Sequence, residues 1–377
     1  MYSSLKVDGY RGFSDYLIHE LKTVNLLVGR NNTGKTSLLE AALILATEGD
    51  PSTFARIASQ RGEEVAVDPD DESPRPDILP DISHFFYGHE IAANASIEIT
   101  DTITNAVKVE VVSRDEIVNQ KQPTLFAPDS YYRVRRRLND WGLLLSLKSF
   151  SEGSALDRYM AMLETGGFDP RAVLHPGRAA AERIERMPSV TFIGAESVDP
   201  KNLRAMWDQT IEQGIESGVV EALQILDATV ESVQFRTSDI RSRSAKSGVL
   251  IGHRGQKRRV PLGSLGDGMR RLLSLALALN HTRDGVLLVD EIDTGLHWTA
   301  MPEMWRLVIE TAIKNDTQVF ATTHSADCIR GLSWACRQHP ELAGHISLQT
   351  IDPELSESIP STAEQLHISM DQDIEVR

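Results

Sequence analysis

The 377-residue chain is poor in cysteine, with only Cys328 and Cys336. The two lie in one C-terminal stretch and lack the paired spacing of a zinc site. This excludes a disulfide-built fold and predicts two reduced thiols of the kind found in cytosolic proteins. Aromatic residues are also scarce at 6%, but hydrophobic residues reach 41%, which is enough for a sizeable core.

Long apolar segments are missing as well. The longest apolar runs, such as Leu272–Leu279, fall well short of a membrane span. The N-terminus has no basic segment followed by an apolar one, so no signal peptide is expected. We therefore expect a cytoplasmic protein without a membrane partner.

Positive charge is in deficit, with 39 Lys and Arg against 54 Asp and Glu and a net charge of −15. Long-range attraction to nucleic acid is therefore not expected, and any such contact needs a local basic patch. One candidate cluster contains Arg133, Arg135, Arg136 and Arg137. A second, in "HRGQKRRV", contains Arg254, Lys257, Arg258 and Arg259. Each cluster can be a solvated surface, or a contact with DNA or another partner.

The stretch "NLLVGRNNTGKTSLLEAALIL" at 25–45 contains the full G-x-x-x-x-G-K-[ST] pattern. An apolar strand is predicted before the loop and a helix of good helix formers after it. In this arrangement backbone N–H groups wrap phosphates, Lys35 neutralises the outer phosphates and the Thr36 hydroxyl binds Mg²⁺. The predicted nucleotide-binding residues are Gly29, Arg30, Asn31, Asn32, Thr33, Gly34, Lys35, Thr36 and Ser37.

A second acidic element follows in "GVLLVDEIDTGLH" at 285–297. Four apolar residues predict a buried parallel strand, and Asp290 lies at its carboxyl end, where open α/β sheets bind ligands. Asp290 is expected to hold Mg²⁺ through water. Glu291 follows Asp290 directly, so its side chain points to the opposite side from that of Asp290. It is the candidate general base for an attacking water.

A third strand with a polar tip is predicted in "TQVFATTHSADCI" at 317–329. His324 lies at that tip, beside two strands that already carry phosphate-binding residues. We therefore expect His324 to contact the γ-phosphate.

The stretch "SLGDGMRRLLSLALAL" at 264–279 places a tight Gly-Asp-Gly turn directly before an apolar helix. Such a turn favours phosphate binding at the helix N-terminus. The helix joins it to the strand of Asp290, so the turn cannot easily fold back onto its own phosphate loop. Residues Gly266, Asp267 and Gly268 are therefore expected to cap the nucleotide of another copy.

Together these stretches resemble the ABC-type ATPases, within them the RecF, SMC and OLD group of AAA_15/AAA_21-like proteins. "GRNNTGKT" matches the Walker A motif, "LLVDEIDTGLH" resembles Walker B with its D-loop, "SLGDGMRR" the degenerate signature motif and "TTHS" the switch histidine. "VDGYRGFSDY" at 7–16 resembles the N-terminal strand pair. The resemblance implies a dimer of heads with ATP between them, a signature role for Gly266 and Gly268, and a D-loop position for Asp293.

The chain departs from its relatives in several places. No sustained heptads indicate an SMC-type coiled coil, and too few residues follow His324 for the TOPRIM nuclease domain of single-chain OLD proteins. "DISHFFYGHE" stands where the family has its Q-loop, but it contains no glutamine. Which residue takes that role is left open.

The expected fold class is α/β, an ABC-type P-loop ATPase head with a mixed sheet core, an antiparallel β-subdomain and a helical insertion. We expect an N-terminal lobe at 1–128, a helical insertion at 129–188 and a C-terminal lobe at 189–377. Residues 51–83 are polar and Pro-rich and predict a loop or a partly disordered insert. The insertion is either a packing lobe or a partner surface.

The function expected from these features is an ATPase that requires ATP and Mg²⁺ and forms a homodimer or higher homo-oligomer. By the resemblance, it controls a separate effector, for example a TOPRIM-like nuclease in anti-phage or plasmid defence. The alternative is a RecF-like DNA-repair clamp that binds DNA directly. A membrane-transporter ATPase fits the "GLH" D-loop poorly. The trigger, the effector and the oligomer size are left open.

Overall fold

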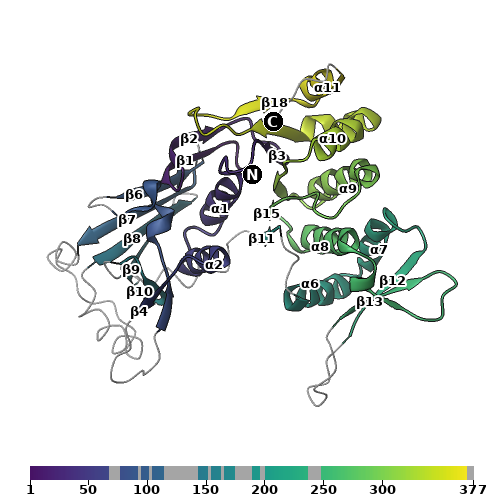
Figure 1. Ribbon diagram of the computed structural model, residues 1–377, viewed down its shortest axis with the longest axis horizontal. Helices are drawn as coiled ribbons and strands as arrows, with labels where there is room; N and C mark the ends of the chain where they lie inside the picture. The colour runs from purple at the N-terminus through teal and green to yellow at the C-terminus, as the bar shows by residue number, and fades with distance from the viewer. Residues whose placement is uncertain are drawn as a thin grey trace, which may run out of the picture.

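The computed structural model describes residues 1–67, 77–91, 95–101, 104–113, 143–151, 154–162, 165–174, 189–195, 200–236 and 248–371. Two lobes flank a central sheet, with the N-terminal lobe on the left and the helical C-terminal lobe on the right in Figure 1. The first arginine cluster, Arg133 to Arg137, lies outside the described residues. Its expected contact with DNA stays a prediction.

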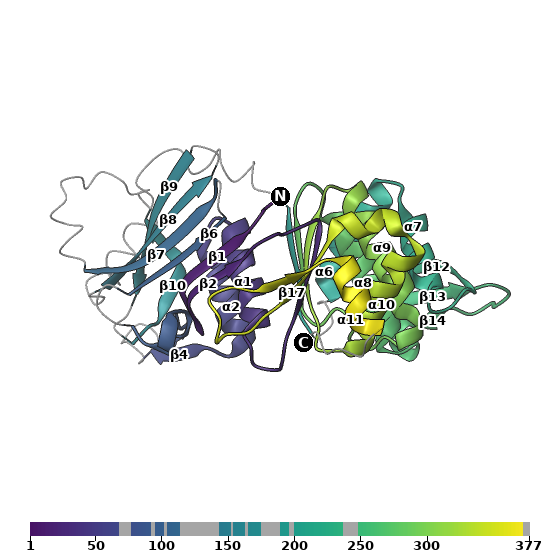
Figure 2. The same ribbon diagram turned by 90° about the horizontal axis from the view of Figure 1, so that it is seen from above.

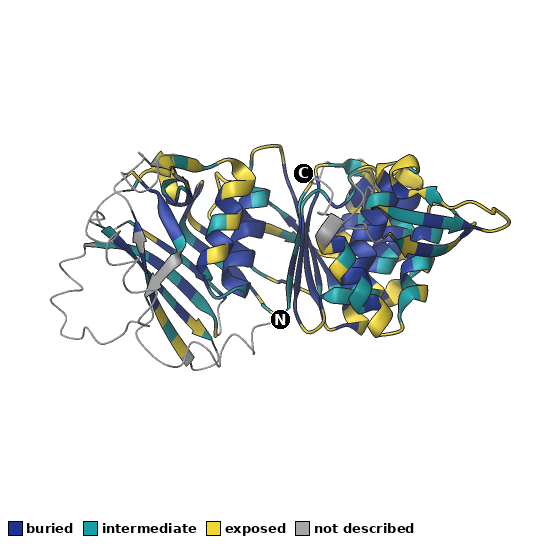
Figure 3. Ribbon diagram, turned by 90° about the horizontal axis from the view of Figure 1, so that it is seen from below, coloured by how far each residue is buried: buried dark blue, intermediate teal, exposed yellow. Residues whose placement is uncertain are grey.

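The central sheet has six strands in the order β11-β15-β16-β3-β17-β18. All neighbours are parallel except β18, which runs antiparallel to β17. The strands are β11 Val190–Ile193, β15 Val286–Val289, β16 Gln318–Thr322, β3 Val24–Val28, β17 Ile346–Thr350 and β18 Ile359–Ser361. Helices cover both faces, which explains the continuous apolar runs in the inner strands. Figure 3 shows these strands almost wholly buried.

Helices divide between the two faces of this sheet (Figure 2). Leu27, Leu288 and Phe320 face α1 Lys35–Ala46, which lies between the central sheet and the sheet of the N-terminal lobe. The alternate residues Leu26 and Val289 face the C-terminal helices. These helices are α8 Asp267–His281, α9 Met301–Lys314 and α10 Ala326–Gln338.

The N-terminal lobe is built on a seven-stranded antiparallel sheet in the order β10-β9-β8-β7-β6-β1-β2. Its strands are β1 Leu5–Tyr10, β2 Phe13–Ile18, β6 Ser96–Thr100, β7 Ala106–Ser113, β8 Leu143–Ser151, β9 Ser154–Met162 and β10 Phe168–Leu174. The expected antiparallel β-subdomain is confirmed, and so is the mixed α/β core.

The expected helical insertion at 129–188 is wrong in its described part. Residues 143–151 and 154–162 form β8 and β9, which pair antiparallel from Leu143 opposite Met162 to Ser151 opposite Ser154. A short apolar run such as "LLLSLKSF" satisfies helical and strand periods alike, and pairing with β7 decides for the strand. Residues 129–142 and 175–188 of the expected insertion lie outside the described residues. The domain boundaries stay a prediction.

Residues 51–83 are not a loop throughout. α2 Pro51–Arg61 begins after Asp50, whose carboxylate accepts a hydrogen bond from the Ser52 N–H, and ends at Gly62. An Asp cap, a proline in the first turn and a glycine after the last residue are ordinary helix boundaries. The strands β4 Glu64–Val67 and β5 Asp77–Pro80 follow, then two short 3₁₀ turns at Ser83–Phe85 and Tyr87–His89.

The C-terminal lobe also contains α6 Pro200–Glu212, α7 Glu216–Gln224 and α11 Ala363–Asp371. A three-stranded sheet of β12 Val230–Phe235, β13 Val249–His253 and β14 Val260–Pro261 lies at its outer end. β14 continues through a 3₁₀ turn at Leu262–Ser264 into the Gly-Asp-Gly turn. Further 3₁₀ turns lie at Trp298–Ala300 and Pro340–His345. Among the described helices, none is long and apolar enough to cross a membrane.

Candidate active site

A cavity of about 680 Å³ opens at the carboxyl ends of β3, β15 and β16. This volume lies in the range of small-molecule sites. Most predicted residues meet there: its wall contains Asn31, Asn32, Thr33, Gly34, Lys35, Thr36, Ser37, Asp290, Glu291 and His324. Gly29 and Arg30 are not part of this wall, but their carbonyls accept hydrogen bonds from the ammonium of Lys35, which is part of it.

The loop between β3 and α1 has the tight shape that the glycine pattern predicts. Gly34 has a φ of 87°, and a Cβ there would lie 2.5 Å from the Phe13 ring. Lys35 turns inward, since its Nζ donates to the carbonyls of Gly29 at 2.9 Å and Arg30 at 2.6 Å. Burial lowers the pKa of Lys35, while Asp290 and Glu291 oppose that shift. The two carbonyl contacts hold the Lys35 amino group inside the loop.

Asp290 joins the first turn of α1 to the neighbouring strand. Its Oδ2 accepts a hydrogen bond from the Thr36 hydroxyl at 3.0 Å, and its Oδ1 accepts one from the Thr322 hydroxyl at 2.5 Å. A hydroxyl and a carboxylate that converge beside a phosphate loop are the hard oxygen ligands that Mg²⁺ prefers. The residues present thus fit the Mg²⁺ ion that the loop pattern implies.

Glu291 lies at the cavity with a backbone of unusual shape. Its φ is 48°, and its N–H donates to the Thr322 hydroxyl at 2.8 Å. A non-glycine residue in this region costs about 1 kcal/mol or more and occurs mainly where the surroundings enforce it. The Glu291 carboxylate lies 3.6 Å from His324 Nδ1, and the Thr294 hydroxyl donates to it at 3.4 Å. Both side chains remain about half exposed.

Several cavity residues were missed in the sequence. Gln60 and Arg61 at the end of α2 line the wall, together with Glu40, Phe192 and Asn202. No residue of "DISHFFYGHE" lines the cavity, so the glutamine found at this site is Gln60, from another segment. The Asp-Pro start and the glycine after Arg61 could have indicated the helix. Its approach to the cavity depends on tertiary packing.

The Gly-Asp-Gly turn does not reach this cavity. Gly266 and Asp267 are exposed, whereas Gly268 is buried, and a Cβ on Gly268 would lie 2.6 Å from the Gly295 carbonyl oxygen. Asp293, the residue expected in the D-loop, accepts a hydrogen bond from the Thr323 hydroxyl at 2.7 Å. None of these four residues belongs to the cavity wall. Their role at a neighbour's nucleotide stays a prediction.

Arg271, also missed, ties α8 to the acidic strand end. Its guanidinium donates to the carbonyls of Gly194, Asp290, Glu291 and Ile292. Burial lowers the pKa of Arg271 to about 10, which leaves it charged at neutral pH. The helix that begins at the Gly-Asp-Gly turn is therefore bound to the backbone that carries Glu291.

Two family models match the chain. Residues 1–136 match AAA_15, described as "AAA ATPase domain". Residues 168–327 match AAA_21, described as "AAA domain, putative AbiEii toxin, Type IV TA system". The first match spans the phosphate loop, and the second spans Asp290, Glu291 and His324.

A curated relative, an "ATP/GTP phosphatase" of Helicobacter pylori, is 21% identical over 359 residues, which cover 90% of this chain and 89% of that protein. Among solved structures, an SMC head bound to the C-winged helix domain of ScpA is 13% identical, with a TM-score of 0.46. The matched region covers 96% of this chain and 98% of the SMC head chain. The head from Pyrococcus furiosus is 11% identical, with a TM-score of 0.47 and 99% coverage of both chains.

Proposed function

We propose that this chain is an ABC-type ATPase of the RecF/SMC-like group, that it hydrolyses ATP between two copies of its own head, and that it thereby controls a separate effector. The matches to two AAA ATPase family models support the ATPase part of the proposal. One observation carries the proposal. Lys35, the Thr36–Asp290 pair and the Glu291–His324 pair surround a single cavity, while the Gly-Asp-Gly turn of the same chain stays outside it.

The chemistry follows from these positions. Backbone N–H groups of the loop and the Lys35 ammonium bind the phosphates, and Thr36 with Asp290 would hold Mg²⁺, which offsets phosphate charge. Glu291 accepts a proton from water as the water oxygen attacks the γ-phosphorus and the bond to ADP breaks. His324, beside Glu291, contacts the γ-phosphate side. The products are ADP and inorganic phosphate.

The dimer supplies what one head lacks. An exposed turn at the N-terminus of α8 presents backbone N–H groups suited to an anion, but none lies at its own cavity. A second copy related by two-fold symmetry would bring this turn to the first copy's nucleotide and complete two equal sites.

Asp267 offers a sharp test of the shared site. Its side chain is 77% exposed and pairs only loosely with Arg270, at 3.3 Å, whereas substitution of Gly268 would disturb the chain's own Gly295. We expect Asp267→Tyr to leave ATP binding to a single head nearly intact but to abolish ATP-dependent dimers and hydrolysis. Calorimetry measures ATP binding, light scattering measures the ATP-dependent dimer, and phosphate release measures hydrolysis. Glu310→Tyr, at a 47% exposed acid on α9, is the matched control.

A complementation experiment shows whether the Gly-Asp-Gly turn serves the nucleotide of the other copy or that of its own chain. Differently tagged Asp267→Tyr and Lys35→Ala chains, co-expressed and purified as heterodimers, combine both lesions in one site and leave the other site whole. Roughly half of the wild-type rate should return if the sites are equal and independent. No recovery, or loss of monomer ATP binding in Asp267→Tyr, would assign the turn to its own chain.

The effector and the cellular setting rest on the resemblance and not on the cavity. By the resemblance, the effector is a separate protein such as a TOPRIM-like nuclease, in cytoplasmic anti-phage or plasmid defence. The description of the AAA_21 family, which names a toxin of a type IV system, lends support. Co-purification of the protein encoded beside this chain, with and without ATP, tests the partnership.

A RecF-like DNA clamp is the second candidate, and one observation favours it. Arg254, Lys257, Arg258 and Arg259 are all exposed on the turn between β13 and β14, just before the Gly-Asp-Gly turn. Within the described residues, only Arg254 of these has an ion pair, with Glu231 at 3.4 Å.

If the DNA-clamp function is correct, duplex DNA should stimulate the ATPase, and this stimulation should fall steeply as the salt concentration rises. Arg258→Glu with Arg259→Glu should remove that stimulation, and a rate insensitive to DNA would reject the clamp.

A further inference from the structure

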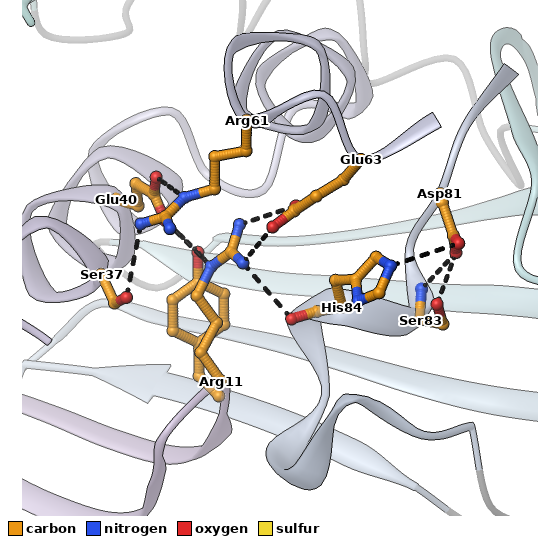
Figure 4. A network of polar contacts seen from close by, with 9 residues as sticks. Arg11, Ser37, Glu40, Arg61, Glu63, Asp81, Ser83 and His84 are labelled. Atoms are coloured by element: carbon orange, nitrogen blue, oxygen red, sulfur yellow. Dashed lines mark hydrogen bonds and ion pairs between the residues drawn. The ribbon is translucent and has the colours of Figure 1, made fainter. Parts of the chain in front are cut away.

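Four charged residues beside the cavity form a network that the proposed ATPase chemistry does not use (Figure 4). We call it the arginine pair network, and it consists of Arg11, Glu40, Arg61 and Glu63. Arg11 lies in the β1–β2 turn, Glu40 on α1, Arg61 at the last position of α2, and Glu63 two residues beyond it. Two positive and two negative charges balance.

Glu40 lies at the centre of this network and is only 6% exposed. Its Oε1 accepts a hydrogen bond from Arg61 Nε at 2.6 Å. Its Oε2 lies 3.0 Å from Arg11 Nε and accepts a hydrogen bond from the Tyr10 hydroxyl at 3.1 Å. Each carboxylate oxygen therefore serves a different guanidinium.

Arg11 is locked in place. Its side chain is 4% exposed, and both terminal nitrogens bind Glu63, at 2.6 and 3.0 Å. The guanidinium also lies over the Phe85 ring, 4.7 Å from its centre. A bidentate pair of this kind, with a ring beneath it, is strong and geometrically specific. Arg11 is not part of the cavity wall, and its buried contacts keep it a fixed partner of Glu40.

Arg61 is held far less firmly. Among the described residues its one acidic partner is Glu40. Its side chain is 32% exposed and lies on the cavity wall. A terminal nitrogen is 3.5 Å from the Ser37 hydroxyl, one residue beyond Thr36 in the phosphate-loop helix. The long, flexible side chain thus lies between the Glu40 carboxylate and the space beside the phosphate loop.

We propose that Glu40 is a positioning residue that restrains Arg61, and that an arriving nucleotide phosphate takes Arg61 over from Glu40. The proposal rests on the proposed function, because it needs a nucleotide in this cavity. A phosphate carries more negative charge than one carboxylate and accepts hydrogen bonds in the same fork geometry.

The network permits this transfer at low cost. When Arg61 leaves, Glu40 keeps Arg11 and the Tyr10 hydroxyl, so no buried carboxylate is left without a partner. The backbone does not need to move, because the Glu63 N–H donates to the Ala58 carbonyl at 2.9 Å and the Glu63 side chain stays bound to Arg11. Only the Arg61 side chain changes its partner. The Glu40–Arg61 bond therefore opposes nucleotide binding.

Equilibrium binding of a non-hydrolysable ATP analogue to the full chain tests the restraint. Glu40→Asp keeps the negative charge but is one methylene too short to hold both guanidiniums. We expect the analogue's Kd to fall about three- to tenfold, the worth of one such hydrogen bond. Glu64→Gln is the control, since Glu64 is an exposed carboxylate nearby whose Oε1 accepts a hydrogen bond from the Ser59 hydroxyl at 2.9 Å. Its Kd should equal that of the wild type.

A double-mutant cycle shows whether the effect passes through Arg61. In an Arg61→Gln background, Glu40→Asp should no longer change the Kd. Tightening that persists there, or a Kd that is unchanged or weaker in Glu40→Asp alone, would overturn the restraint. If Glu40→Asp unfolds, Arg61→Gln and Arg61→Gln/Glu40→Gln remain measurable and must show equal Kd values. A wild-type chain that binds no nucleotide would instead reject the proposed function.

Discussion

Lys35→Ala should abolish detectable ATP binding, a loss of about a hundredfold or more in affinity. Among the described residues, Lys35 supplies the only ammonium on the cavity wall. A charge-assisted hydrogen bond to a phosphate contributes about 1.5–3 kcal/mol, and the loss of charge neutralisation adds to this. In the chain without nucleotide, Lys35 Nζ donates hydrogen bonds to the Gly29 and Arg30 carbonyls. Removing it therefore also loosens the loop that wraps the phosphates.

Calorimetry with ATP measures this loss, and thermal unfolding without nucleotide shows whether the chain still folds. Lys314→Ala removes a lysine from the last turn of α9 that is not part of the cavity wall, and this variant should bind ATP as the wild type does. An unchanged affinity in Lys35→Ala would refute the phosphate-loop assignment.

Glu291→Gln should keep ATP binding and stop hydrolysis, with a rate lower by about 10²–10⁴-fold. An amide has nearly the shape of the carboxylate but accepts no proton from water. The Thr322 hydroxyl still holds the Glu291 backbone N–H, so the left-handed backbone at this position is kept. The chain should therefore accumulate in its ATP-bound, dimeric form.

Phosphate release gives the rate, and light scattering with ATP gives the trapped dimer. Glu303→Gln is the control, because Glu303 is an acid in the first turn of α9 whose ion pair within the described residues is with Arg306, at 2.8 Å. Turnover at the wild-type rate in Glu291→Gln would remove Glu291 from the role of base. Hydrolysis that stops without a trapped dimer would contradict the shared site and leave the base intact.

Predictions from sequence succeeded where a local pattern is also the cause of the structure. The glycines of the phosphate loop are required by its backbone, as the φ of Gly34 shows. The apolar runs before Gly29 and Asp290 predict buried parallel strands because both faces are covered by helices. Carboxyl ends of neighbouring parallel strands meet at one edge, so Lys35, Asp290 and His324 were expected to converge.

Predictions failed where two local patterns are equally satisfied. The apolar run at 143–150 fits a helix face as well as a strand, and only hydrogen bonding to β7 and β9 decided between them. The Q-loop segment was placed by chain order, but Gln60 reaches the cavity from α2, ahead of that segment. Chain order alone does not show which element packs against α1.

The sequence by itself determined the phosphate loop, the acidic strand end with Glu291, the strand tip with His324 and the helix that begins directly after Gly266. Each of these depends on neighbouring residues and on hydrophobic period. Only the tertiary structure decided which charges meet: Glu40 between Arg11 and Arg61, and Arg271 on four carbonyls. The partners of these charges are distant in the chain, so they come together only when the two sheets pack on α1 and the helices pack on the central sheet. A buried charge needs such a partner because burial without one is costly.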